Sequence, residues 1–191
     1  MPDFVRIVVV AVVGLALGLV ASGYALSRMS PFDRTRLGAW SIEPHAGSVD
    51  ADPYTRARMA RSGEIPLAIG EGLELIARED DEGRPLEARC VYKIGPRAPA
   101  ARYWTLSLVD LEGFPVANPA ERYGFRSSEI LRAGGAFVIT AAADAQPGNW
   151  LPIGAPGRFA LALRLYDSPL GATAGAIDPA TAPRVARIGC G

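Results

Sequence analysis

The residues able to do chemistry are few in this sequence and stand far apart. His45 is the only histidine among the 191 residues, so a Ser-His-Asp triad would have to use it. It follows Pro44 in a stretch typical of a solvated loop, and a metal site of several histidines is excluded. Asp80, Asp81 and Glu82 stand together in a predicted turn, where consecutive acids are usually solvated rather than bound to calcium. We therefore expect no metal.

Motifs that carry catalysis or nucleotide binding are missing as well. The chain has no G-x-G-x-x-G, no G-x-x-x-x-G-K-[ST] and no G-x-S-x-G. The carboxylates are scattered, so an acidic pair acting on sugars would have to be assembled by the fold alone. Formal net charge is zero, which gives no reason to expect a nucleic acid partner. The sequence favours a non-catalytic domain without a cofactor; an enzyme, or an enzyme subunit, built on Asp, Glu, Tyr or Arg stays open.

The sequence holds two cysteines, Cys90 and Cys190. They are either a disulfide pair or two unrelated thiols. A bond between them would close a loop of about 100 residues and stabilise the fold by up to about 4.7 kcal/mol in the chain-entropy model. It would also hold a C-terminal end that otherwise frays. Metal and redox motifs are not indicated, because there is no C-x-x-C.

Candidate ligand contacts are aromatic and polar residues on strand-like or loop segments. They are Tyr103, Trp104, Asn118, Tyr123, Asn149, Trp150, Arg164 and Tyr166. Trp150 could stack on a sugar or another apolar ring, with Asn149 and Arg164 supplying hydrogen bonds. In the competing structural interpretation, Trp150 fills one end of the fold, Asn149 satisfies loop backbone and the other aromatics belong to the core or its rim.

The first element of the chain is an N-terminal apolar segment. Residues 5–26 form a run of 22 residues interrupted only by Arg6, and about 20 helical residues cross a ~30 Å hydrocarbon core. We predict an uncleaved transmembrane helix here. A cleaved signal peptide is the alternative, because Gly23 and Ala25 are small residues at plausible cleavage positions. Gly14 and Gly18 form a G-x-x-x-G, a spacing that permits a homo-oligomer through close helix packing.

The flanking charges and the cysteines favour opposite orientations of this helix. The positive-inside rule sets Arg6 on one side against Arg28, Arg34 and Arg36 on the other, which would place the domain in the cytoplasm. A disulfide would indicate the opposite side, because disulfides persist in oxidising compartments.

The rest of the chain divides into a connector and one folded domain. We expect residues 1–28 to be tail and anchor, 29–50 a juxtamembrane connector without a clear period, and 51–191 the domain. A short helix is predicted over residues 54–61, because Asp52 can cap it, Pro53 suits its first position and Gly63 ends it. Its three arginines are either solvated or in contact with lipid headgroups.

Short strands dominate the prediction for the domain, because 21 glycines and 16 prolines interrupt the chain. The strand-like segments are residues 73–77, 86–94, 103–110, 135–142 and 159–166, with a hairpin joining the first two, a loop at 147–152 and an irregular tail from 167 onward. Arg164 points outward on its strand and, if buried, needs an acidic partner, for which Asp110 and Glu121 are candidates. The pattern predicts a mainly β fold, an antiparallel sandwich with one or two short helices.

Three motifs in order carry a resemblance to a known family. YWTLSLVDLEGFPVANPAERYGF, PGNWLPI and RFALALRLYD, preceded by DPYTRA from Asp52, resemble the family catalogued as domain of unknown function 1214. In that family a tryptophan-bearing strand leads to an N-P loop, an N-W-L-P loop and an R-x-Y strand. Cys90 and Cys190 match positions where its short, membrane-anchored members tend to carry cysteine. The resemblance covers most of the chain after the apolar segment.

The resemblance implies a jelly-roll type of β-sandwich and a location in the cell envelope. That location favours the Cys90–Cys190 disulfide and places the domain in the periplasm, on an inner-membrane anchor. Longer members fuse this domain to another, domain of unknown function 1254, so a separate protein carrying that domain is an expected partner. No reaction comes with the resemblance, and a binding module for a partner protein or a glycan-like ligand is the expectation that follows.

Overall fold

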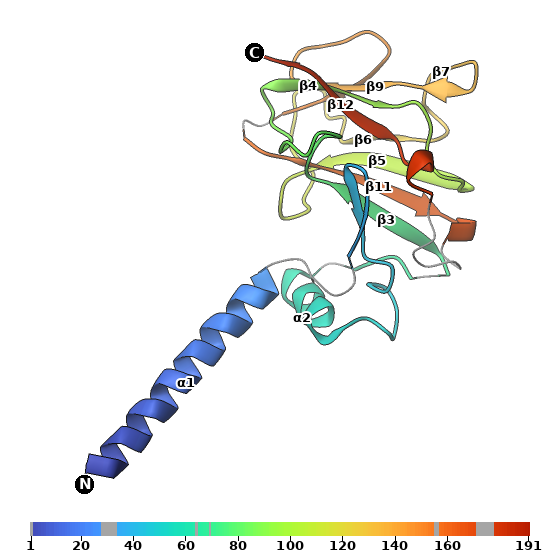
Figure 1. Cartoon of the computed structure of the whole chain (residues 1–191). Coiled ribbons are helices and arrows are strands. Elements are labelled where there is room, and N and C mark those ends of the chain that lie inside the picture. Colours follow the sequence, from blue (N-terminus) through green and yellow to red (C-terminus); the bar gives the residue numbers. More distant parts are fainter. Residues whose placement is uncertain (1, 28–33, 64, 69, 155–156, 171–177) are drawn as a thin grey trace.

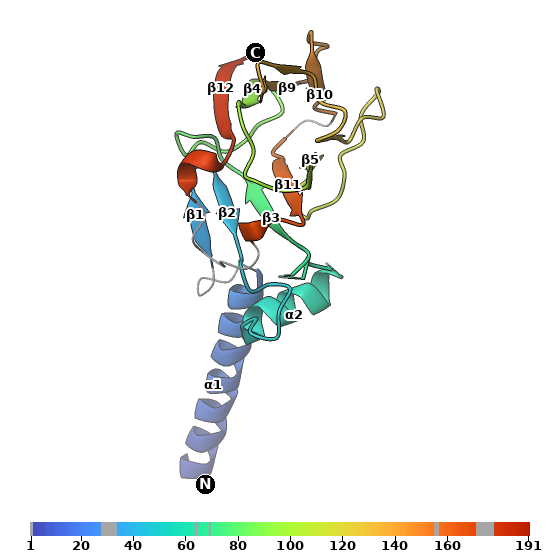
Figure 2. The ribbon, with the colours of Figure 1, turned by 90° about the vertical axis from the view of Figure 1, so that its right-hand side faces the viewer.

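The computed structural model describes residues 2–27, 34–63, 65–68, 70–154, 157–170 and 178–191. An N-terminal helix, α1 (Pro2–Ser27), extends away from a β-sandwich. The second helix, α2 (Pro53–Ser62), lies beside the C-terminal end of α1 (Figure 1 and Figure 2). The two helices are in contact. Most of the remaining strands form two sheets, of six and four strands, in a mainly β fold as the strand pattern predicted.

Helix α1 is long and apolar enough to cross a membrane. Its apolar span Asp3–Ala25 has 23 residues, and an 18-residue window within the span has a mean hydropathy of 2.7 and is not buried against the domain. These properties suit an anchor and a signal sequence alike. Arg28, which entered the charge count for its orientation, lies outside the described residues.

Helix α2 begins and ends where its sequence signals predict. The Asp52 carboxylate accepts hydrogen bonds from the backbone N–H of Tyr54 at 2.9 Å and of Thr55 at 3.2 Å. Gly63 follows the helix with φ of 72°, a left-handed conformation that glycine adopts at low cost. Thr55 is fully buried, so the side of the helix that carries it faces the domain.

The larger sheet has six strands in the order β1-β2-β3-β11-β5-β6. Their bounds are β1 (Thr35–Leu37), β2 (Trp40–Ile42), β3 (Gly72–Ala77), β11 (Ala160–Tyr166), β5 (Tyr103–Val109) and β6 (Gly124–Arg126). The predicted alternation of inward and outward side chains is confirmed on β5, where Trp104, Leu106 and Leu108 face the core. All neighbours in this sheet are antiparallel.

The smaller sheet has four strands in the order β10-β9-β4-β12. Their bounds are β10 (Asn149–Pro152), β9 (Ile139–Ala142), β4 (Cys90–Gly95) and β12 (Arg184–Cys190), and a separate pair joins β7 (Arg132–Ala133) to β8 (Ala136–Phe137). Strands β9 and β10 are parallel, and the other pairs are antiparallel. The inward side chains of both sheets, such as Leu163 and Tyr92, share one core.

Three sequence-based expectations about elements are wrong. The segment expected to be an irregular connector supplies β1 and β2, and Trp40 is 1% exposed with its indole N–H donated to the Pro183 carbonyl at 2.6 Å. Strands of three residues are too short to show a period, so the sequence did not reveal them. The predicted loop at 147–152 contains β10, and the predicted irregular tail contains β12 and the short 3-10 helix η2 (Pro179–Thr181).

The expected hairpin between β3 and β4 is also wrong. Strand β3 pairs with β2 and β11 in the larger sheet, whereas β4 pairs with β9 and β12 in the smaller one. The chain between them crosses from one sheet to the other, with one isolated bridge between Glu79 and Pro85. Alternation shows which face a strand buries but does not show its partner, which is why the two strands looked like a hairpin.

Candidate ligand-binding site

A row of polar side chains crosses the outer face of the six-stranded sheet. The strand register places Glu74, Arg164, Thr105 and Arg126 side by side on β3, β11, β5 and β6. The Arg164 guanidinium Nε lies 2.7 Å from Glu74 Oε1, with side-chain exposures of 41% and 20%. The acidic partners expected for Arg164 from the sequence were therefore wrong, because the register brings it to β3.

A groove of about 410 Å³ lies beside this row, between the sheet and the end of helix α2. Its floor is formed by small or apolar side chains of adjacent strands, Ile76, Val109, Ala160 and Ala162. Alanine at two successive outward positions of β11 leaves room that larger side chains would fill. The chain after α2, including Leu67, forms one wall.

The opposite wall of the groove is a turn after β5 that presents Phe114. The Asp110 carboxylate accepts hydrogen bonds from the backbone N–H of Glu112 at 3.0 Å and of Phe114 at 2.8 Å, so its geometry sets the turn. Phe114 is 63% exposed and lines the groove. It was not among the predicted contacts, although an exposed aromatic after an Asp turn signal was visible in the sequence.

Charged groups close the groove near α2. Arg58 of α2 forms an ion pair with Glu43, and the side chains are 19% and 7% exposed. Just before β1, Arg34 donates a hydrogen bond to Ser41 Oγ of β2 at 3.0 Å. Burial lowers the pKa of Arg34, and the nearby Glu43 carboxylate partly offsets this. Near α2 the groove thus offers an ion pair, Arg58 with Glu43, to a ligand.

A second, more open concavity of about 490 Å³ adjoins the first groove on the same face. Thr105 and Ser107 line it, and their cross-strand partners Arg164 and Ala162 line the first groove. Tyr123, which is 43% exposed, and Arg126 complete its described edge. Together the two concavities run across β3, β11, β5 and β6 on the outer face, with an apolar floor in the first; we call them the outer-face groove.

The structure places the predicted contacts on both sheets. Tyr103 and Tyr166 lie on the outer face of the larger sheet, with ring centroids 5.9 Å apart. Trp104 points into the core, 5% exposed, and packs on Phe137 at 5.1 Å between centroids. Asn118 lies in a turn and bonds to the backbone of Arg122.

Asn149 and Trp150 belong to the smaller sheet and do not meet Tyr103 or Arg164. The Asn149 carboxamide accepts from Leu131 N–H at 2.8 Å and donates to the carbonyls of Leu131 and Val138. Trp150 donates its indole N–H to the Ala142 carbonyl at 3.0 Å. Asn149 thus forms hydrogen bonds with backbone groups of the loop, as the structural interpretation of the sequence expected.

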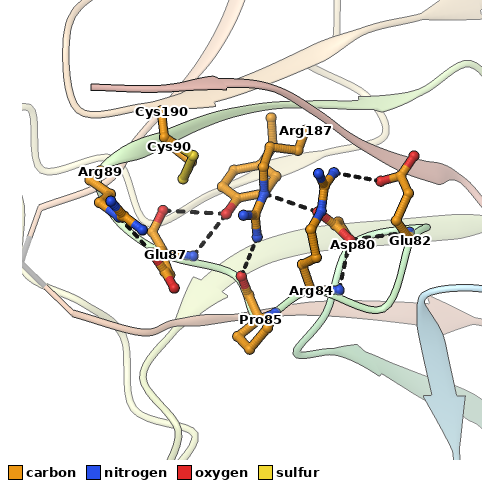
Figure 3. The surroundings of a disulfide bond; sticks show 10 residues. Asp80, Glu82, Arg84, Pro85, Glu87, Arg89, Cys90, Arg187 and Cys190 are labelled. Atoms are coloured by element: carbon orange, nitrogen blue, oxygen red, sulfur yellow. Dashed lines mark hydrogen bonds and ion pairs between the residues drawn. A yellow bond between two sulfur atoms is a disulfide. The ribbon is translucent and has the colours of Figure 1, made fainter.

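Away from the groove, a disulfide joins the C-terminal strand β12 to β4, and ion pairs join β12 to the chain between β3 and β4. Cys90 and Cys190 lie opposite each other on β4 and β12 and are bonded, with an S–S distance of 2.02 Å (Figure 3). The disulfide indicated by the family resemblance is thus present. Arg187 of β12 reaches the Asp80 carboxylate, with Nε 2.9 Å from Oδ2.

Asp80 is 1% exposed, which corrects the expectation of a solvated acidic turn. It accepts hydrogen bonds from the backbone N–H groups of Glu82 and Arg84 and from the Arg84 side chain. Burial by itself would raise the pKa of Asp80. The hydrogen bonds from Arg84 and the positive charges of Arg187 and Arg84 outweigh burial and lower the pKa.

Another carboxylate with a shifted pKa, Glu87, lies in the same region. Its pKa is lowered, chiefly by the hydrogen bond from Arg89 Nε at 2.6 Å and by the charge of Arg89. Among the residues that the structure describes, no group of three or more His, Cys, Asp or Glu could hold a metal ion.

The protein is thus a β-sandwich with a groove on its outer face, and an apolar helix precedes the sandwich. The chain belongs to the family described as protein of unknown function (DUF1214), whose model matches residues 71–170. The match includes all of β3, β4, β5 and β11, together with the floor of the first groove. The family resemblance drawn from the sequence motifs is confirmed.

Solved structures extend the comparison at the level of the fold. The VPA0106 protein from Vibrio parahaemolyticus is 18% identical with a TM-score of 0.59, and the alignment covers 73% of this chain and 36% of that one. A putative uncharacterized protein from Burkholderia cenocepacia is also 18% identical, with a TM-score of 0.40 and coverage of 89% and 47%. The chain thus spans less than half the length of either protein. None of the curated proteins matches.

Proposed function

We propose that this chain is a membrane-anchored binding module of the bacterial envelope. In this proposal α1 is an uncleaved anchor in the inner membrane, the sandwich lies in the periplasm and the outer-face groove takes a polar, glycan-like ligand. The observation that carries the ligand proposal is the row Glu74, Arg164, Thr105 and Arg126, which runs between two adjoining concavities. The disulfide supports an oxidising compartment.

The groove has the composition of a site for a small polar ligand with an apolar face. Pockets of this kind combine apolar and aromatic surface with a few oriented polar groups. Phe114 supplies an exposed ring at one wall, and Arg164 is held in position by Glu74. Tyr123 supplies a second ring at the far concavity. A sugar ring stacked on Phe114 would bring its hydroxyl groups to the polar row.

Replacing Phe114 by alanine tests this site. Because Phe114 is 63% exposed, its truncation should leave the fold intact while removing the stacking surface. We expect binding of full-length protein to an array of neutral and acidic oligosaccharides to weaken roughly tenfold, equal to about 1.4 kcal/mol. Ile188→Ala, at another exposed apolar residue on β12, is the matched control and should bind normally. Equal binding by both variants would refute the groove as the glycan site.

A partner protein is the second candidate function. The alignment to the Vibrio protein covers only 36% of that chain, so most of that protein lies outside the aligned region. A separate protein with domain of unknown function 1254 would supply a counterpart, as the family resemblance suggested. Affinity purification of the full-length chain from native membranes should recover such a protein at constant stoichiometry; recovery of this chain alone would count against it.

A homo-oligomer through Gly14 and Gly18 is a separate proposal for α1. A Cβ added at either glycine meets nothing within 4 Å, so Gly14→Leu with Gly18→Leu should not disturb the chain itself. A smaller cross-linked species in the double variant would support helix packing through these glycines, and an unchanged size would refute it.

A further inference from the structure

The end of the sandwich next to α1 exposes apolar and aromatic side chains that the core does not use. Val49, before α2, is 86% exposed, and Ile65, after α2, is 94% exposed. Tyr54, in the first turn of α2, is 42% exposed. These three side chains lie on or beside one short helix and expose apolar surface at this end of the domain, and exposed apolar surface of this kind often marks a site of contact.

This surface lies at the level where a membrane would end. Helix α1 contacts α2, and both views show α2 beside the C-terminal end of α1 (Figure 1 and Figure 2). Tyr24, 63% exposed, stands near the end of the apolar span Asp3–Ala25. Tyrosine is enriched at the boundary between hydrocarbon and water, so Tyr24 marks the headgroup layer if α1 crosses a bilayer.

The charges around α2 fit a surface of lipid headgroups. Tyr54, Ala57 and Arg61 follow one another at helical spacing and all are exposed, so they share the outward side of α2. Arg56 is also exposed, and its guanidinium donates hydrogen bonds to the carbonyls of Val49 and Ala51. The outward side thus carries Arg61 next to Tyr54, and Arg56 lies exposed on a flank of the helix near Val49; basic groups next to exposed apolar ones are the combination by which helices lie in a membrane interface.

We propose that helix α2 and its flanking residues Val49 and Ile65 dock onto the headgroup layer of the membrane that α1 crosses. The inference rests on the proposed anchoring of α1. The side of α2 that carries Thr55 and Arg58 stays against the sandwich, and the opposite side meets lipid. Docking would hold the domain at a fixed tilt, and because Ile65 also lines the first groove, that groove would open beside the membrane surface.

Tryptophan reporters in the full chain test the docking. Ile65→Trp and the control Ile188→Trp each add one indole ring at an exposed isoleucine. Ile188 lies on β12, and this strand is far from α1 (Figure 1). Each variant is placed in nanodiscs of phosphatidylcholine and phosphatidylglycerol with brominated acyl chains. We expect Ile65→Trp to lose severalfold more emission to bromine quenching than Ile188→Trp, since Trp40, Trp104 and Trp150 give both variants the same background.

A second variant excludes that the added tryptophan itself drives the contact. Val49→Asp with Ile65→Asp places charge on the surface without touching the core. In nanodiscs, trypsin should then cleave after Arg61 severalfold faster than in the unaltered chain, with cleavage after Arg122 unchanged. If the chain enters nanodiscs but both reporters are quenched equally and trypsin is insensitive to the variant, docking is refuted while anchoring stands. If the chain does not enter nanodiscs, the anchoring is wrong, and the docking with it.

Discussion

At the scale of single residues, Asp80 shows how a carboxylate in an acidic stretch becomes structural. Asp80 accepts bonds from Arg84 and the local backbone and is paired with Arg187, whose side chain is 13% exposed. The neighbouring Glu82 is 56% exposed and contacts only the half-exposed Arg84 among the ion pairs of the described residues. Asp80 and Glu82 therefore differ in burial, because only Asp80 is paired with a buried arginine of the C-terminal strand.

Asp80→Asn should destabilise the fold by about 3 kcal/mol, because it leaves the buried Arg187 without a charged partner. Glu82→Gln is the matched control and should cost less than about 1 kcal/mol, since its pair is exposed. Urea unfolding at pH 7 measures both. Equal effects of the two substitutions would contradict the structural role of Asp80.

The lowered pKa of Asp80 also sets a pH dependence. A carboxyl whose pKa is lower when folded than when unfolded adds stability above its unfolded pKa, about 3.9, and loses it as the pH falls through the folded pKa. Unfolding free energy should therefore fall below about pH 4 more steeply in the unaltered protein than in Asp80→Asn. Parallel curves for the two proteins would show that Asp80 does not contribute.

At the scale of elements, β12 is an edge strand joined to the rest of the molecule by several different contacts. It pairs with β4, the disulfide bonds its last residue to Cys90, and Arg184 and Arg187 reach Asp81 and Asp80. The ion pairs and strand pairing should keep β12 in place after the disulfide is lost, although the strand then opens more readily.

Cys90→Ala with Cys190→Ser tests the contribution of the disulfide. For a loop with a sequence separation of 100 residues, the chain-entropy model predicts a loss of about 4–5 kcal/mol. We expect urea unfolding to show a loss of that order and hydrogen exchange to show faster exchange in β12 than in β11. Unfolding of the unaltered protein with a reductant present is the control, and no difference between oxidised and reduced protein would contradict the prediction.

At the scale of the whole molecule, α1 projects from the sandwich without packing on it, so its environment must be supplied from outside the chain. We expect full-length protein to remain in the membrane pellet after alkaline extraction, with a mass that includes residues 1–25. A chain beginning after Ala25 in the soluble fraction would instead identify residues 1–25 as a cleaved signal sequence.

Local sequence patterns determined much of this protein. The apolar length of α1, the Asp52 and Gly63 signals of α2, and the alternation of β5 and β11 depend on residues close together in the chain, and each appeared where predicted. The presence of only two cysteines left a single possible intramolecular pair. The motifs in β5, β10 and β11 were sufficient to indicate the family.

Tertiary structure alone decided which segments meet. Strands β1, β2 and β12 carry too little pattern to be seen locally and are ordered by their partners. Alternation did not show that β3 would pair with β11, so Glu74 could not be matched to Arg164 in advance. The groove with Phe114 depends on the same long-range register. Periodicity reflects the geometry of one strand, whereas strand partners and the grooves between them arise from contacts that chain neighbours do not specify.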